Sequence, residues 1–158
     1  MTKSVFFSFH HDLDAWRANQ VRNHNVTKDD NAGYLDAAEW EKVEKEGDAA
    51  VKNWIDDQLK GTSVTVVLIG AETSTRPFVK YELEQSWKKG NGILGIHIHN
   101  LKNQNGEITT KGDTNFGILF KDSSDDAGQV FAKKFQTYDW VGDKGFDNFG
   151  KWIESTTK

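Results

Sequence analysis

Three uncharged runs of apolar and β-branched residues limit the folds open to this chain more than any other feature. They lie at residues 5–10, 63–70 and 93–99. Such runs are typical of strands buried on both faces of a parallel sheet. Apolar residues at helical spacing lie between them, so strands and helices alternate along the chain. The alternation predicts an α/β fold in which a central parallel sheet of about five strands carries helices on both faces.

Local patterns predict further elements. Amphipathic spacing predicts helices over about 48–60 and 76–89. The stretch "FQTYDW" at 135–140 predicts a last strand, and "FDNFGKWIES" at 146–155 predicts a closing helix. The chain is therefore predicted to end in a strand followed by a helix, which continues the alternation of strands and helices.

The region after the first strand is less regular. Asp12 or Asp14 is expected to cap a helix that begins near Ala15. Residues 23–46 are polar and rich in turn formers, so we expect a long loop with at most a short strand and a short helical piece. That short strand would be the second of the sheet.

Composition excludes several classes of function. A chain of 158 residues fits one domain, 1–158. Its 20 Lys and Arg against 24 Asp and Glu give a formal net charge of −4, and there is no basic block of the kind that binds nucleic acid or an anionic membrane. The absence of cysteine excludes disulfides, thiolate catalysis and Cys-ligated metals. The first apolar run is too short for a signal peptide or a membrane span, so we expect a cytoplasmic protein.

The stretch "GNGILG" at 90–95 matches the dinucleotide-binding pattern G-x-G-x-x-G. That pattern binds phosphate only where a strand precedes the glycines and a helix follows them. Here the predicted order is the reverse, a helix and then a strand. Gly90 is therefore predicted to be a helix C-terminal cap, and the stretch is not expected to bind phosphate.

In a doubly wound sheet, ligands bind outside the carboxyl ends of the strands. One such chemistry, phosphoryl transfer to a receiver aspartate, needs an aspartate at the end of the third strand and a lysine at the end of the fifth. This chain has Gly70 and Trp140 at those places. Receiver chemistry is therefore not expected.

Four of the five histidines form two pairs, His10 with His11 and His97 with His99. Imidazole is a common metal ligand, so a shared metal site has to be considered. In the expected strand order 2-1-3-4-5, however, the third strand separates the pairs. We expect no metal site; the histidines are then satisfied or face solvent, and His10 or His11 lines a ligand pocket.

Glu82 is a further candidate. It follows Phe78 by four residues, so both lie on one side of the predicted helix, near its start at the ligand edge. An aromatic ring and a carboxylate would then face the cleft together. Spacing alone equally describes an ordinary surface glutamate on a solvated helix face.

Longer segments of the chain resemble TIR domains. "VFFSFHHD" at 5–12 is similar to their first strand, "SVTVVLIGAETSTRPFVKYELEQS" at 63–86 to their third strand and following helix, and "GILGIHIHNLKN" at 92–103 to their fourth strand. The segments "WRANQVRNHNV", "GYLDAAEWE" and "GDAAVKNWIDDQLKG" resemble the TIR-like group linked to the NAD-processing protein of Thoeris anti-phage systems. The similarity extends to about residue 120 and implies a flavodoxin-like TIR fold.

The resemblance implies an NAD-cleaving enzyme that releases nicotinamide. In enzymatic relatives the helix after the third strand carries an aromatic residue, more often Trp, and four positions later the required glutamate, which correspond to Phe78 and Glu82. NAD would be the substrate, with no separate cofactor, and the product a cyclic ADP-ribose type signal that activates a separate effector. The alternative is a non-enzymatic TIR adaptor that acts through protein association or self-assembly.

The expected chemistry needs little more than a carboxylate. Nicotinamide leaves NAD as a neutral molecule and leaves positive charge on the ribose, as in glycoside hydrolysis. A fixed carboxylate would stabilise that charge. We expect the helix N-terminus to help keep Glu82 ionised.

Five further residues are expected to complete the substrate pocket. The Ser8 hydroxyl stands in an apolar strand and needs a partner, either a ligand or a neighbouring backbone group. His10 and His11 end that strand, and Arg76 begins the Glu82 helix, where it could meet a pyrophosphate. Asp36 is included only because it lies in the "GYLD" segment of the resemblance.

Overall fold

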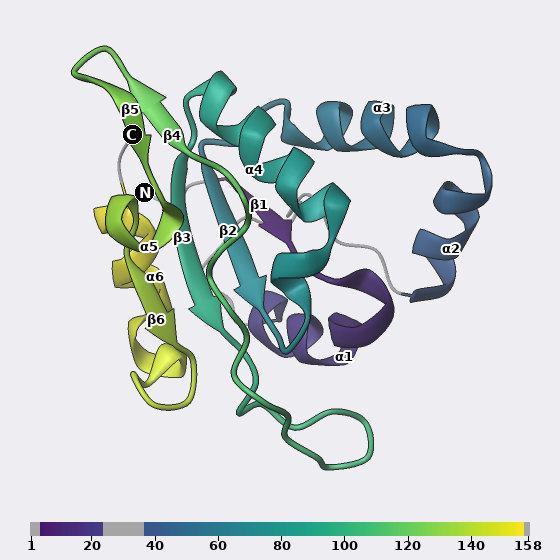
Figure 1. Ribbon diagram of the computed structural model, residues 1–158. Helices are drawn as coiled ribbons and strands as arrows, with labels where there is room; N and C mark the ends of the chain where they lie inside the picture. Colours follow the sequence, from purple (N-terminus) through teal and green to yellow (C-terminus); the bar gives the residue numbers. More distant parts are fainter. Residues whose placement is uncertain (1–3, 24–36, 157–158) are drawn as a thin grey trace.

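The computed structural model describes residues 4–23 and 37–156, and its centre is a parallel sheet (Figure 1). Four described strands form this sheet in the order β1-β2-β3-β6. Their bounds are Val5–Ser8, Val64–Ile69, Gly92–His97 and Thr137–Asp139. The observed strands β1, β2, β3 and β6 correspond to the expected first, third, fourth and fifth strands, in the expected order. The expected second strand was placed in a segment that falls largely at 24–36, outside the described residues.

Helices account for most of the remaining described chain. They are α1 (His11–Arg22), α2 (Ala37–Lys45), α3 (Asp48–Leu59), α4 (Pro77–Lys89), α5 (Phe131–Lys134) and α6 (Gly145–Ser155), with a 3-10 turn at Thr73–Thr75. None of the described helices is long and apolar enough to cross a membrane. A short antiparallel pair, β4 (Phe120–Asp122) and β5 (Asp125–Gln129), was not predicted.

Helices cover both faces of the sheet (Figure 1), and alternate residues of β2 pack toward opposite faces. Val66 and Leu68 of β2 belong to a cluster that includes residues of α1 and α6. Val67 and Ile69 of the same strand pack with residues of α4 and the 116–131 segment. The predicted doubly covered α/β sheet is therefore confirmed.

A third cluster joins α2 and α3 to the first strand. Phe6 of β1 packs with Trp40 of α2 and with Val51, Ile55 and Leu59 of α3. Burial of each large apolar side chain stabilises the fold by about 1.5–3 kcal/mol. The cluster holds Trp40 close to the end of β1.

The start of α1 differs from the prediction. The helix begins at His11, and its N-cap is His10, whose Nδ1 accepts a hydrogen bond from the Leu13 amide at 3.2 Å. Asp14 is buried instead, 3.5 Å from Arg17, so it does not cap the helix. A Cβ on Gly70 would overlap the Asp14 carboxylate, so the Asp14 side chain occupies space that only glycine leaves open.

The 90–95 stretch joins a helix to a strand, as predicted. Gly90 caps α4 in the left-handed conformation, with φ of 95°. β3 then begins at Gly92. These glycines therefore serve as a helix cap and the start of a strand.

Candidate functional site

Ser8 and Glu82 meet at the carboxyl end of β1. Ser8 is the last residue of β1, and Glu82 lies in the second turn of α4. The Ser8 hydroxyl donates a hydrogen bond of 2.6 Å to Oε1 of Glu82, and the two residues are 0% and 1% exposed. The partner of Ser8 is thus a side chain, neither of the two partners expected.

Burial changes the charge state of Glu82. Removal from water raises the pKa of this carboxyl to about 8, although the Ser8 hydrogen bond acts to lower it. The expectation that the helix N-terminus keeps Glu82 ionised is therefore wrong for the resting protein. The Glu82 side chain is not on a solvated helix face.

A small cavity lies beside Glu82, with a volume of about 10 Å³. Its lining comes from the segment after β1, the start of α1, the first turns of α4 and α2: Phe9, His10, His11, Asp12, Trp40, Arg76, Phe78, Val79 and Glu82. His10, His11, Arg76 and Phe78 are thus brought to Glu82, while Ser8 reaches the cavity through its hydrogen bond. Asp36 lies outside the described residues.

Aromatic rings close one side of this cavity. The rings of His11 and Trp40 stack with centroids 4.1 Å apart and planes at 9°. Trp40 meets Phe78 edge to face at 6.0 Å and Trp54 at 5.8 Å. Trp40 was not predicted as a site residue, because α2 is mostly polar and Val43 is its only other large apolar residue, which is too little to indicate a buried face.

His10 serves both the helix and the cavity. Because its Nδ1 accepts from the Leu13 amide, the neutral ring carries its proton on Nε2. Burial and the neighbouring Arg76 charge lower the pKa of His10. His10 is therefore a neutral hydrogen-bond donor in the lining.

The arrangement suits a cationic ligand. A buried carboxyl of raised pKa loses its proton when a positive charge comes close to it, and the aromatic rings offer apolar surface to a flat group. In the described part of the chain, no group of three His, Asp or Glu side chains is placed to hold a metal ion.

Comparison with known proteins agrees with this architecture. Residues 6–103 match the family model described as Thoeris protein ThsB, TIR-like domain. A protein of Bacillus cereus (strain MSX-D12), named "Putative cyclic ADP-D-ribose synthase ThsB1", is 37% identical over 191 aligned residues. That alignment covers 97% of this chain and 100% of the relative. The matched family region contains both Ser8 and Glu82.

Proposed function

The chain belongs to the TIR-like family of Thoeris ThsB proteins, and we propose that it cleaves NAD, releases nicotinamide and makes a cyclic ADP-ribose type signal for a separate effector in anti-phage defence. The observation that carries the proposal is the buried Ser8–Glu82 pair beside a cavity lined by Trp40 and Phe78. The name of the Bacillus cereus relative supports the same chemistry.

The reaction breaks the bond between the ribose C1′ and the nicotinamide nitrogen. The bonding electron pair passes to the nitrogen, so the pyridinium ring leaves neutral and the ribose becomes positive. The Glu82 carboxylate stabilises that charge, as carboxylates do in glycoside hydrolysis. Attack on C1′ by an atom of the same molecule then closes a ring, while attack by water gives linear ADP-ribose.

The raised pKa of Glu82 suits a substrate of this kind. Without substrate, the protonated carboxyl avoids an unpaired charge in an apolar site. The pyridinium cation of bound NAD favours the carboxylate, because an opposite charge lowers the pKa of a nearby acid. Binding of NAD then releases a proton and produces the charged group that the reaction needs.

Substrate entry requires movement of an aromatic side chain. A cavity that holds benzene is about 150 Å³ in engineered proteins, and the cavity beside Glu82 is about 10 Å³. The contacts that close it are the stacking of Trp40 on His11 and its edge contact with Phe78. Nicotinamide enters when Trp40 or Phe78 turns away.

The pH dependence of the reaction tests the role of this carboxyl. We expect kcat/KM for NAD to rise about tenfold per pH unit below about pH 8 and to level above it, because kcat/KM follows ionisation in the free enzyme. Ser8→Ala removes the hydrogen bond that lowers the Glu82 pKa. The pH profile of kcat/KM of this variant should therefore shift to higher pH. If Ser8→Ala and wild type show the same pH profile of kcat/KM, the ionisation that controls the reaction belongs to a group other than Glu82.

Phe78 is expected to contact the substrate. Phe78→Ala should weaken apparent NAD binding by about 1–3 kcal/mol, the range for loss of a stacked base, and Phe78→Trp should retain activity. Because Phe78 also packs against Trp40, urea unfolding of each variant measures the stability cost separately. Unchanged NAD dependence in a folded Phe78→Ala protein would place the substrate on another side of α4.

The direct test of the function is incubation of the purified protein with NAD, with chromatography of nicotinamide and of the adenine-containing products. Release of nicotinamide together with a cyclic product is the expected result. The assay is repeated over a range of protein concentrations, so that self-assembly can occur. If no nicotinamide is released at any of them, the non-enzymatic adaptor is favoured.

A further inference from the structure

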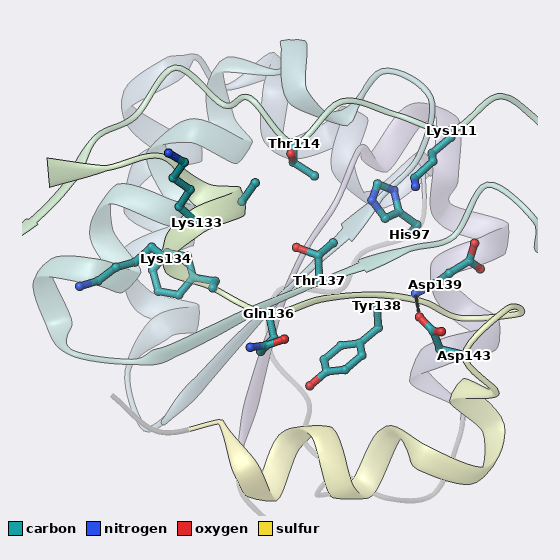
Figure 2. Close-up of a pocket in the computed structure, with 12 residues that line it drawn as sticks. His97, Lys111, Thr114, Lys133, Lys134, Gln136, Thr137, Tyr138, Asp139 and Asp143 are labelled. Atoms are coloured by element: carbon teal, nitrogen blue, oxygen red, sulfur yellow. Dashed lines mark hydrogen bonds between the residues drawn. The ribbon is translucent and has the colours of Figure 1, made fainter.

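A second cavity extends along β6 from α5 to the loop after the strand, and one end of it lies at the carboxyl ends of β3 and β6, beside His97 and Asp139 (Figure 2). It shares no lining residue with the Glu82 cavity. Its volume is about 460 Å³, within the range of small-molecule sites. The carboxyl ends of parallel strands are where α/β proteins bind ligands. The position and size therefore both fit a binding site.

His97 gives this cavity a buried polar group. The residue is 6% exposed and lines the cavity, and its Nδ1 has no hydrogen-bond partner in the described part of the chain. Burial, the Lys111 charge and His99 lower the pKa of His97, so the ring is neutral. Buried polar atoms are usually hydrogen-bonded, and a neutral imidazole can both donate and accept. Nδ1 is fully enclosed, so a ligand in the cavity supplies the missing partner once the His97 ring turns this nitrogen toward it.

The cavity lining offers ammonium and hydroxyl groups to an anion, with Lys111 beside His97 and Lys133 at the opposite end (Figure 2). Four lining side chains make no hydrogen bond or ion pair with any described residue: Lys111, Thr114, Lys133 and Thr137. Lys134 differs, because its ammonium is 2.7 Å from Asp122. Ammonium and hydroxyl groups together suit a phosphate.

The cavity also contains two carboxylates, at the end away from Lys133 and Lys134 (Figure 2). Oδ1 of Asp139 accepts hydrogen bonds from the amides of Val141 and Gly142, both at 3.1 Å. Oδ2 of Asp143 accepts from the Asp139 amide at 2.8 Å. Oδ2 of Asp139 also accepts from Nδ2 of Asn100 at 3.4 Å and lies 3.8 Å from Nε2 of His99. Asp143 is held by the backbone through Oδ2, so its Oδ1 is the oxygen that can accept from a hydroxyl, as acidic residues do from the ribose of nucleotides.

We propose that this cavity binds a ribose phosphate at the His97 end, with its phosphate against Lys111 and a ribose hydroxyl against Asp143 (Figure 2). His97 then bonds the ligand at the floor of the cavity. This site does not depend on the proposed NAD cleavage, because it uses none of the residues around Glu82.

Histidine ring NMR tests the two sites separately. His97 and His99 report on this cavity, and His10 and His11 report on the Glu82 cavity. Titration with ADP or with ribose 5-phosphate, at concentrations up to millimolar, is expected to shift the His97 signals until they saturate. Adenosine, which lacks phosphate, is expected to leave these signals unchanged. Binding of ribose 5-phosphate as tight as that of ADP would show that the base is not recognised.

Lysine variants make the test specific. Lys111→Gln, an exposed position, should weaken the His97 response to ADP about tenfold or more through loss of a charge-assisted hydrogen bond. Lys88→Gln at the end of α4 makes the same charge change away from the cavity and should have no effect. Shifts confined to His10 and His11, an equal response to adenosine, or equal ADP binding by Lys111→Gln would overturn the proposal.

Discussion

Replacement of Glu82 by glutamine is expected to reduce nicotinamide release at least about 100-fold. Loss of one group that stabilises transition-state charge costs about that much or more, and here the group is the only carboxylate bonded to Ser8. Glutamine has the shape of the protonated glutamate and can still accept from Ser8, so the fold should be retained. Chromatographic measurement of nicotinamide at saturating NAD checks the result.

Glu84→Gln is the matched control for this variant. Glu84 lies on the same helix, two residues along, and is half-exposed. Its replacement should leave nicotinamide release within about twofold of wild type, since surface changes usually have small effects. Wild-type turnover in a folded Glu82→Gln protein would remove Glu82 from the mechanism.

The stability of the protein should fall with rising pH because of the same side chain. The folded-state pKa of Glu82 is about 8, above its ordinary value of 4.5, so the folded protein favours the protonated form. The contribution of this group is fully present below about pH 4.5 and is lost as pH rises toward about 8. One such proton is worth about 1.4 kcal/mol per pH unit.

Glu82→Gln isolates that contribution, because glutamine does not titrate. Asp14, whose pKa burial raises to about 6, is present in both proteins and cancels in the comparison. The difference in free energy of unfolding, wild type minus variant, should fall by roughly 2 to 3 kcal/mol between about pH 5 and about pH 7. Urea unfolding at each pH measures it, and a difference that stays constant with pH would mean that Glu82 titrates normally.

Local patterns were sufficient to predict most of the sheet and its helices. β2 and β3 are uncharged and β-branched, and α4 has a clear apolar stripe ending at Gly90, so propensity, burial and capping agree there. The β4–β5 pair was missed because its strands are short and polar and show no apolar alternation.

The start of α1 was predicted wrongly for a related reason. Asp is a preferred capping residue and His is not, so the pattern favoured Asp12 or Asp14. Asp14 is instead buried, paired with Arg17 one helical turn along and packed over Gly70, a residue far away in sequence that no local pattern could indicate. His10 then provides the cap.

The spacing of Phe78 and Glu82 placed both on one side of α4, and the cavity contains both. The same spacing could not predict that Glu82 is buried, because its partner Ser8 is 74 residues away in sequence. Trp40 likewise becomes a site residue only through its stacking on His11. The charge state of the candidate site therefore depends on tertiary contacts.

A structure of the Glu82→Gln protein with bound NAD tests the central claim most directly, because the variant should hold the substrate without cleaving it. We expect the nicotinamide ribose beside residue 82 and Ser8, with a ring of the ligand against Phe78 and Trp40 displaced from its contact with His11. NAD bound away from residue 82, with the Trp40–His11 stack intact, would contradict the account.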